Sequence, residues 1–396
     1  MDARRIMSSP TQPSLFELFC SFSRLGLTAF GGPSMVAYIR KMAVDQKGWL
    51  DTETFNQGIA LCQMIPGATA MQVTAFIGLR TRGVLGAAVS FVGFGLPAFL
   101  IMMVAAATYA YVRNMAIVLS AFSGLQAIIV ALIANATLSF GKITMKSWMH
   151  FAIAGVAVVL FGLEVNPVIV IMVAAVGGLV FMRPKSKRPT IDQGLSPIQV
   201  KSTIKPIVWI LGVVVLGLLL LFFLQRDWFN LASLFLRIDL FAFGGGFASI
   251  PLMYHEVVEV RQWMDSATFL NGIALGQVTP GPIVITATFI GYLVLGPLGG
   301  ILATISIFLP SFTLVVGIAP YFDHLRSSAY FNQVIQGVLC SFVGLLFTVT
   351  LRFAWNVHWD LPHILLASGA LVALLLKVDI LWVVFTGTII SLFMFH

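Results

Sequence analysis

The chain has 396 residues, of which 59% are hydrophobic and 10% are charged, and its mean hydropathy is +0.98. A soluble domain of this length could not bury so much apolar surface in one core, so the composition excludes a soluble globular protein. The formal net charge of +8 comes from residues in short connections rather than from one basic face, which argues against a nucleic-acid partner. The sequence predicts an all-α polytopic membrane protein.

The N-terminal segment and the cysteines show no sign of processing or of redox chemistry. Arg4 and Arg5 are followed by polar residues through Ser14, so no cleavable signal peptide is expected. The three cysteines lie inside apolar stretches, without the paired spacing of a disulfide framework or a zinc site. We expect them to be reduced packing residues, and we expect no metal and no cofactor. The cysteines are Cys20, Cys62 and Cys340.

Apolar segments recur along the whole chain, and segments of about 17 to 25 residues can cross a hydrocarbon core about 30 Å thick. The sequence predicts about 13 such segments, some of them broken or re-entrant. The first six are residues 15–39, 55–79, 83–112, 115–140, 148–163 and 166–182. A connecting segment at 207–224 is followed by six more, at 228–252, 268–292, 297–320, 330–351, 361–376 and 379–395.

The predicted organisation is two homologous units joined by a polar linker. The N-terminal unit is 1–182, the linker with its connecting helix is 183–227, and the C-terminal unit is 228–396. The stretch at 183–205 is rich in Pro, Ser and Lys, which is typical of a flexible boundary. Its basic residues are also suited to contact membrane lipid headgroups.

The strongest pattern in the chain is a duplication. Residues 49–67 read WLDTETFNQGIALCQMIPG, and residues 263–281 read WMDSATFLNGIALGQVTPG. Upstream of each copy, an arginine is followed by Phe-Gly-Gly, once after Arg24 and once after Arg237. Seven predicted spans separate equivalent positions, so the halves should be inverted repeats. Many transporters build one central site from two such halves.

The distribution of basic residues predicts a cytoplasmic N-terminus. With this orientation, most of the 23 Lys and Arg residues, including those of the linker, lie on the cytoplasmic side, as the positive-inside rule requires. Arg113, Arg226 and Arg352 would face outward singly, whereas Arg40, Lys41 and Lys47 would face outward as a cluster. Their position indicates that one or both of the repeated segments re-enter the membrane rather than cross it.

Each half contains two places where helix-breaking residues interrupt a predicted span. Broken backbone is tolerated in hydrocarbon only where it is buried in protein or lines a polar cavity. A proline that begins a half-helix leaves free N–H groups and a positive dipole end facing the centre, which suits an anion. Close packing through small residues and a simple proline kink are the alternatives. The break residues are Gly31, Gly32 and Pro33; Pro66 and Gly67; Gly244, Gly245 and Gly246; and Thr279, Pro280 and Gly281.

Two glutamines and two arginines occupy matching positions near the breaks. Gln63 and Gln277 precede the Pro-Gly dipeptides by about one helical turn, where an amide could bind an oxyanion or join neighbouring helices. Arg24 and Arg237 lie within apolar sequence, where two guanidinium groups could neutralise a dianion or could snorkel to an interface. Because both pairs are duplicated in register, we interpret all four as substrate-binding residues, together with the glycine and Pro-Gly breaks.

Three acid-base residues of the second half are candidates for proton coupling. Asp239 lies inside a predicted span, and its counterpart in the first half is Gly26. This carboxyl group could carry a proton or could serve as the counter-ion of a neighbouring arginine. His255 and Glu256, near the end of the same span, are the second choice.

No soluble-enzyme signature is present. The chain has no phosphate-binding Gly-Lys-Ser/Thr loop, no dinucleotide fingerprint, no HExxH motif and no cluster of cysteines. The buried acids are few and unpaired, so no catalytic residue is assigned. An intramembrane enzyme is therefore disfavoured.

These motifs resemble the chromate ion transporter family in its long form with two homologous halves. The matching strings are RLGLTAFGGP (24–33), ALCQMIPG (60–67), FGGGFASIPLMYHEVVE (243–259) and GIALGQVTPGPIVITATFIGY (272–292), with matched prolines at 97 and 310. They extend over most of both halves. The family usually carries Pro-Gly-Pro in both halves, whereas the first half here reads Pro66-Gly67-Ala68. This departure puts in doubt an equal contribution of the two halves.

The resemblance implies a secondary transporter in a bacterial-type plasma membrane that exports chromate from the cytoplasm and confers chromate resistance. The driving force would be the membrane potential or a proton gradient. The residues alone indicate only a transporter of a small oxyanion. Chromate and sulfate are both tetrahedral dianions, so sulfate is a competitor or, by uptake or exchange, an alternative substrate. The direction, the coupling ion and the choice between a monomer and a homodimer stay open.

Overall fold

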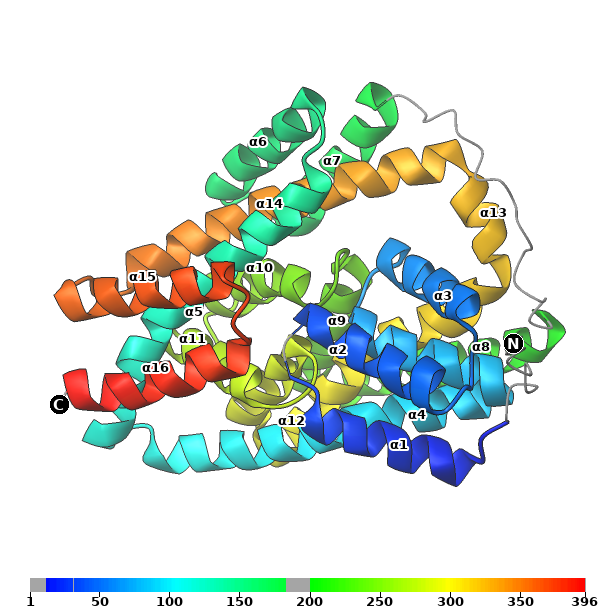
Figure 1. Cartoon of the computed structure of the whole chain (residues 1–396), viewed down its shortest axis with the longest axis horizontal. Helices are drawn as coiled ribbons and strands as arrows, with labels where there is room; N and C mark the ends of the chain where they lie inside the picture. The colour runs from blue at the N-terminus through cyan, green and yellow to red at the C-terminus, as the bar shows by residue number, and fades with distance from the viewer. Residues whose placement is uncertain (1–11, 31, 183–199, 396) are drawn as a thin grey trace, which may run out of the picture.

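The computed structural model describes residues 12–30, 32–182 and 200–395, and every regular element in these ranges is helical. The predicted all-α fold is confirmed. Gly31 and residues 183–199 of the linker lie outside the described residues. In Figure 1 the helices form an elongated bundle, with α1 (Leu15–Thr28) and α16 (Ile380–Met394) toward opposite ends of the long axis.

The longer helices and the π-helix recur in the same order in both halves, and the second half has additional short helical turns. After α1, the first half has α2 (Gly32–Arg40), a π-helix η1 (Lys41–Gln46), α3 (Thr52–Met64), α4 (Thr69–Val112), α5 (Ala116–Thr144), α6 (Trp148–Gly162) and α7 (Pro167–Phe181). The connecting helix is α8 (Val200–Leu224). The second half has α9 (Arg226–Phe241), η2 (Gly246–Ala248), α10 (Ser249–Tyr254), a π-helix η3 (His255–Val260), α11 (Ser266–Val278), η4 (Ile283–Ile285), α12 (Thr286–Ile318), η5 (Ala319–Tyr321), α13 (Phe322–Ser327), α14 (Ala329–Asn356), α15 (Leu361–Leu375) and α16.

Duplicated residues set the same helix ends in both halves. Asp51 and Asp265, from the repeated Trp-x-Asp, cap α3 and α11 by accepting hydrogen bonds from backbone N–H groups at 2.8 and 2.7 Å. Just past each π-helix the backbone has positive φ, 60° at Gly48 and 52° at Gln262. The sequence duplication therefore extends to the backbone conformation.

Both α4 and α12 reverse direction within one run of helical residues. The reversals occur at Gly83 and Gly296, which have φ of 66° and 71°. In α12, the Thr288 and Thr304 hydroxyl oxygens lie 2.7 Å apart, although 16 residues, about 24 Å of straight helix, separate them. We call the parts before and after each reversal the arm and the limb: 69–81 and 84–112 in α4, and 286–294 and 297–318 in α12.

Each arm also folds back on the helix that precedes it. A Cβ added to Gly58 of α3 would lie 2.4 Å from the Phe76 ring in the arm, and one on Gly272 of α11 would lie 2.5 Å from the Phe289 ring. Helix and arm are thus the two sides of a hairpin, and the Pro-Gly dipeptide forms its turn. We call these turns the first tip (residues 65–68) and the second tip (residues 279–282).

A second type of hairpin begins each half. Lys47 Nζ lies 2.8 Å from Glu17 Oε1, so the chain after η1 has returned to the start of α1. In the second half, α10 likewise packs against α9. The turns of these hairpins hold the Phe-Gly-Gly motifs, and we call them the first glycine break (residues 29–32) and the second glycine break (residues 242–246).

Five described helices are long and apolar enough to cross a membrane by length and composition: α4, α5, α8, α12 with its flanking turns, and α14. The sequence predicted about 13 segments. The difference arises because 15–39, 55–79, 228–252 and 268–292 are each interrupted by a tip or a glycine break. In addition, α6, α7, α15 and α16 each have only 15 residues.

The two halves are interlocked. The α6–α7 pair of the first half packs on α14, and the α15–α16 pair of the second half packs on α5. Small residues allow close approach: Gly178 of α7 and Gly337 of α14 touch, and Gly124 N–H of α5 donates to Ser391 Oγ of α16 at 3.1 Å. The connecting helix α8 is different, since the most apolar part of its span has no buried residue.

Candidate functional site

The tips and the glycine breaks of opposite halves meet at the centre of the bundle. Gly67 N–H of the first tip donates to Ala242 O of the second glycine break at 2.9 Å. Gly281 N–H of the second tip donates to Ala29 O of the first glycine break at 3.0 Å. Each Pro-Gly turn is therefore fixed to a break in the other half, and neither half could form this centre alone.

Glycine is required at these turns for two reasons. Gly67, Gly244, Gly245 and Gly281 have φ between 96° and 117°, where side chains are disfavoured. Their Cβ positions are also occupied: one on Gly67 would lie 2.0 Å from Ser311 Oγ, and one on Gly244 would lie 2.2 Å from an aromatic ring of α5. The breaks predicted from the sequence thus form a tight junction.

The second glycine break lies between the two tips. A Cβ on Gly245 would be 3.2 Å from the hydroxyl of Thr69, which begins α4, and one on Gly246 would be 4.0 Å from the backbone N of Ile283, which begins η4. The first N–H groups of a helix have no partner within that helix, so donors from both halves border this segment. This convergence agrees with the expected polar centre.

The tip glycines differ from the expectation of free donors. Their N–H groups are occupied by the Ala242 and Ala29 carbonyl oxygens. The physical reason is that a buried donor is paired whenever a carbonyl is within reach. Any anion at this centre would use the N–H groups of the following residues, or would have to displace these two bonds.

The two matched glutamines have different environments. Gln63 is exposed, whereas Gln277 is only 7% exposed and its Nε2 has no hydrogen-bond partner among the described residues. An unpaired buried amide is costly and is suited to accept a ligand. The Thr279 hydroxyl is not free to donate to a ligand, because it donates to Leu275 O of its own helix at 2.8 Å.

Gln72 and Ser311 were not predicted as site residues. Gln72 Nε2 donates to Pro66 O of the first tip at 2.5 Å, and its Oε1 has no partner among the described residues. Ser311 Oγ accepts from Ala68 N–H of the same tip at 3.0 Å. Ser311 matches Ala98 and Gln72 is not repeated as a glutamine in the second half, so a search for duplicated residues overlooks both. A polar side chain in an apolar segment is the signal that could have found them.

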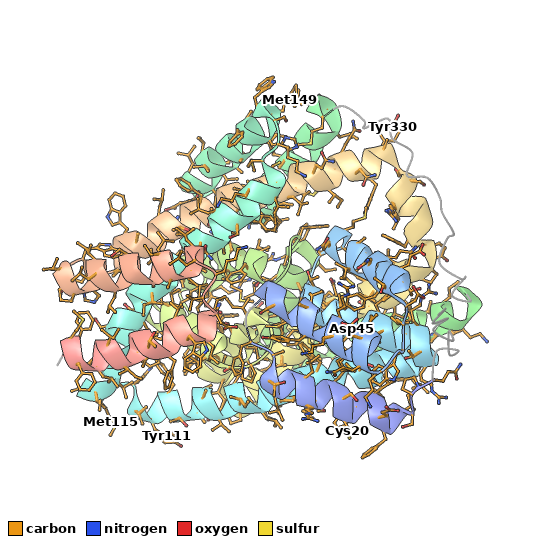
Figure 2. All side chains as sticks on the ribbon, viewed as in Figure 1. Cys20, Asp45, Tyr111, Met115, Met149 and Tyr330 are labelled. Atoms are coloured by element: carbon orange, nitrogen blue, oxygen red, sulfur yellow. The ribbon has the colours of Figure 1, made fainter. Side chains whose placement is uncertain are left out.

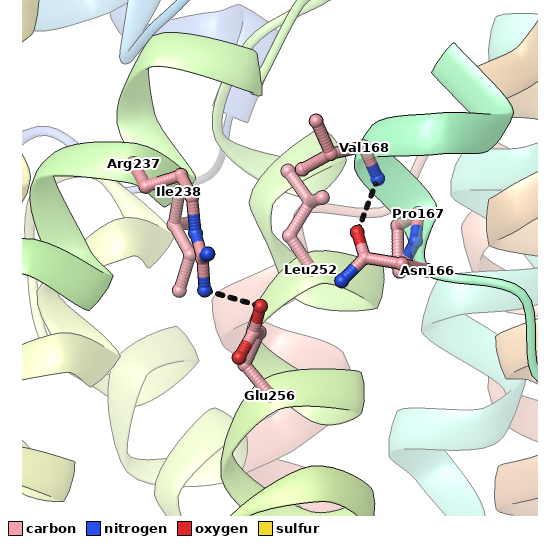
Figure 3. Close-up of a pocket in the computed structure, with 7 residues that line it drawn as sticks. All are labelled: Asn166, Pro167, Val168, Arg237, Ile238, Leu252 and Glu256. Atoms are coloured by element: carbon pink, nitrogen blue, oxygen red, sulfur yellow. Dashed lines mark hydrogen bonds and ion pairs between the residues drawn. The ribbon is translucent and has the colours of Figure 1, made fainter. Parts of the chain in front are cut away.

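The two matched arginines also differ. Arg24 is exposed on α1. Arg237 forms an ion pair with Glu256 Oε1 at 2.5 Å, and Arg261 contacts the other oxygen of the same carboxylate. Figure 3 shows the Arg237–Glu256 pair beside the N-terminus of α7, where Asn166 caps the helix. The cavity between them, about 10 Å³, has room for about one water molecule and not for a tetrahedral oxyanion.

A second ion cluster lies on η3. His255 Nδ1 is 2.8 Å from Glu259 Oε2, and Arg352 of α14 contacts Glu259 and donates to Phe161 O at 2.6 Å. In the first half, Met42 stands where the second half has Glu256. The structure thus places His255 beside Glu259 and Glu256 between two arginines at the end of a hairpin.

Asp239 is the fully buried acid of the molecule's centre. Its Oδ2 accepts hydrogen bonds from the backbone N–H and the hydroxyl of Ser311, both at 2.7 Å. Its Oδ1 has no partner among the described residues. Through Ser311, this carboxyl group is linked to Ala68 of the first tip. Of the two alternatives open from the sequence, pairing with an arginine is not found among the described residues, and a proton-carrying role stays a prediction.

A second, larger cavity among the described residues is apolar. Its volume is about 400 Å³, and it lies between the limbs of α4 and α12, lined mainly by aromatic and aliphatic side chains such as Phe91, Phe99 and Phe312. An anion would lose its hydration there without gaining donors. We therefore place the candidate site at the tips and not in this cavity.

Comparison with known proteins agrees with the duplicated architecture. A model of the family described as chromate transporter matches residues 16–179 and 229–392, once in each half. The chain belongs to the chromate transporter family. The family predicted from the sequence motifs is thereby confirmed, and the chain is an integral membrane protein with apolar helices long enough to span the bilayer.

Several relatives in the chromate transporter family match nearly the whole chain. An uncharacterised transporter of Methanocaldococcus jannaschii is 40% identical, with 97% of this chain and 96% of that protein covered. A chromate transport protein of Cupriavidus metallidurans is 31% identical, with 95% and 91% covered. A chromate transport protein of Pseudomonas aeruginosa is 29% identical, with 87% and 82% covered. No solved structure matches the chain.

Proposed function

We propose that the protein is a secondary active transporter that exports chromate from the cytoplasm and confers chromate resistance. Family membership supports chromate as the transported ion. The observation that carries the proposal is the crosswise hydrogen bonding of the tips, Gly67 to Ala242 and Gly281 to Ala29. It joins both halves at one centre, which is the arrangement that lets a transporter expose one site alternately to each side.

In this proposal the oxyanion binds where the second glycine break lies between the helix starts of α4 and η4. The donors are backbone N–H groups after each tip, the Thr69 hydroxyl and the unpaired amide of Gln277. Dipole and amide donors bind a dianion without the tight ion pair that a nearby arginine would form, so release stays fast. Arg24 and Arg237 would act at a distance, as positive charge on the entry paths.

We also propose a topology of five crossings, made by the α4 limb, α5, α8, the α12 limb and α14, with every tip hairpin re-entrant. The Glu17–Lys47 contact supports this topology. It places Lys47, and with it Arg40 and Lys41, on the same side of the membrane as the N-terminus. With that side cytoplasmic, the three residues no longer violate the positive-inside rule. Arg82, whose Nε donates to Pro13 O at 2.6 Å, lies on the same side.

This topology makes the halves inverted, since three crossings separate equivalent positions. The side-chain view is consistent with it. Figure 2 shows Tyr111 and Met115, at the junction of α4 and α5, at the far end of the molecule from Tyr330 at the start of α14. We place the protein in a bacterial-type plasma membrane with the N-terminus in the cytoplasm.

The energy for export would come from the membrane potential, with proton coupling through Asp239 or through His255 and Glu256. A potential of about 100 mV, negative inside, is worth roughly 2.3 kcal/mol for each charge moved, so it favours expulsion of a dianion. Transport of sulfate by the same site, and passive flow of anions, are the competing functions.

Everted membrane vesicles test the proposal. Vesicles that contain the protein should accumulate labelled chromate when a potential and a pH gradient are imposed separately, and unlabelled sulfate should compete. Equal accumulation by vesicles without the protein would contradict it. Import of sulfate by whole cells without chromate flux would favour the sulfate transporter, and chromate flux with no accompanying proton movement in any gradient would favour a channel.

A further inference from the structure

We propose that Asp239 and Ser311 are positioning residues that hold the first tip in place through the N–H of Ala68, a latch that the second tip lacks. The inference concerns the mobility of the two tips, and its consequence for transport rests on the proposed function. The latch joins three elements: α9 supplies the carboxylate, α12 supplies the hydroxyl, and the first tip supplies the N–H group.

The geometry of the latch is a continuous relay. Ser311 Oγ accepts from Ala68 N–H at 3.0 Å and donates to Asp239 Oδ2 at 2.7 Å. The Ser311 N–H, directly after Pro310 in α12, also donates to Oδ2 at 2.7 Å. Asp239 and Ser311 have no exposed surface, so water does not compete for these bonds.

The equivalent positions around the second tip lack all three functional groups. Gly26 corresponds to Asp239 and has no carboxylate, Ala98 corresponds to Ser311 and has no hydroxyl, and Pro282 corresponds to Ala68 and has no N–H. A Cβ on Gly26 would lie 2.3 Å from Phe94 O, and one on Gly281 would lie 2.7 Å from Ala98 Cβ. Apolar contact therefore replaces the relay there.

Each member of the latch would be unfavourable without the others. An Ala68 N–H facing Ala98, or an Asp239 facing an alanine, would be a buried polar group without a partner, which costs more than the bond itself contributes. The absence of a second proline after Gly67 is thus explained: Ala68 provides the donor that Ser311 requires. The difference between Ala68 and Pro282 therefore goes together with the difference between Ser311 and Ala98.

The latch gives the first tip more attachments than the second. Toward the opposite half, the first tip is held by the bond from Gly67 to Ala242 and by the relay through Ser311. Among the described residues, the second tip has one hydrogen bond toward the opposite half, from Gly281 to Ala29. We infer that the second tip moves when the site opens, while the first tip stays fixed.

Hydrogen exchange on the purified full-length protein in lipid nanodiscs tests the latch. In Ser311→Ala, backbone amides of the peptide covering 65–72 should exchange about tenfold faster, because the Ala68 N–H has lost its acceptor. The peptide covering 279–285 should be unchanged. Thr313→Ala is the matched control, since the Thr313 hydroxyl bonds only carbonyls of its own helix and its loss should alter neither peptide.

A rescue separates positioning from a general loss of stability. Ala68→Pro removes the N–H that Ser311→Ala leaves unpaired, so the double variant should transport chromate about fivefold faster than Ser311→Ala alone. The triple variant with Asp239→Gly reproduces the residues found around the second tip and should approach wild-type abundance in the membrane. If Ser311→Ala and Thr313→Ala exchange alike, or if Ala68→Pro is equally harmful with and without Ser311, the latch is refuted.

The two proposals can fail separately. If the wild-type protein transports no chromate, the exchange of residues 65–72 in Ser311→Ala still decides whether the latch exists. If chromate is transported and the exchange is unchanged, the proposed function stands and the latch is wrong.

Discussion

The two halves share their backbone turns and differ in the polar groups that surround those turns. Both have an aspartate cap before the first helix of each tip hairpin, a π-helix that ends at positive φ, and a glycine that reverses the next helix. Only the second half contributes Asp239, Ser311 and Glu256. The comparison indicates that duplicated residues build the architecture, whereas unduplicated ones make the two tips chemically distinct.

The largest effect should come from breaking what the halves share at the tips. Gly67→Leu and Gly281→Leu each place a side chain at positive φ and against a close neighbour, so each should lower chromate transport at least about 100-fold. Gly212→Leu in α8 is the control, because nothing lies within 4 Å of its Cβ position. Both variants are measured in everted vesicles at equal membrane abundance. Normal transport by either tip variant would mean that the tips are packing features only.

The arginines offer a sharper comparison, since they match in sequence and differ in contacts. Arg237→Ala removes one partner of the buried Glu256 and should lower transport about tenfold or more, whereas Arg24→Ala should have an effect of about threefold or less. Replacing Glu256 by glutamine in the Arg237→Ala background should recover part of the loss. Equal effects of the two single variants would show that their contacts do not determine their roles.

The glutamines should show a smaller difference of the same kind. Gln277→Ala removes the unpaired buried amide and should raise the KM for chromate about fivefold, while Gln63→Ala, at an exposed position, should change it less than about twofold. Initial rates over a range of chromate concentrations give both values. A larger shift in KM for Gln63→Ala would place the anion on the other side of the first tip.

The smallest effect should be the same in both halves. Asp51→Ala and Asp265→Ala each remove one helix cap and should lower stability by about 1 kcal/mol without changing the KM. Burial raises the pKa of Asp51, but hydrogen bonds from Thr54 outweigh it and hold the pKa below its usual value. The cap is therefore present at neutral pH and is lost as the pH falls through the lowered pKa.

Thermal unfolding in one detergent measures these two cap variants. The matched control is Glu53→Ala, which lies in the first turn of α3 without acting as its cap. If only one of the two aspartates proved important, the claim that duplicated residues have the same structural role would fail.

Sequence patterns predicted the fold class, the duplication and the four breaks, because glycine and proline interrupt apolar helices in a way that composition reveals. They also placed segment boundaries at 79–83 and 292–297, where the chain reverses at Gly83 and Gly296. About 13 segments were expected and five described helices are long and apolar enough to cross, because tips and glycine breaks divide four of the expected segments and four other helices have only 15 residues. The match between the two repeats identified Gly67 and Gly281. It did not identify Ser311, whose contact with Ala68 joins distant segments, or Gln72, whose contact with Pro66 depends on the fold of the first tip.

Equilibrium binding of labelled chromate to the purified protein tests most directly whether the two halves form one site. The crosswise junction of the tips predicts one chromate per chain, displaced by sulfate, with binding lost in Gly67→Leu and equally in Gly281→Leu. Two chromate ions per chain, with each variant losing only one of them, would contradict a shared central site.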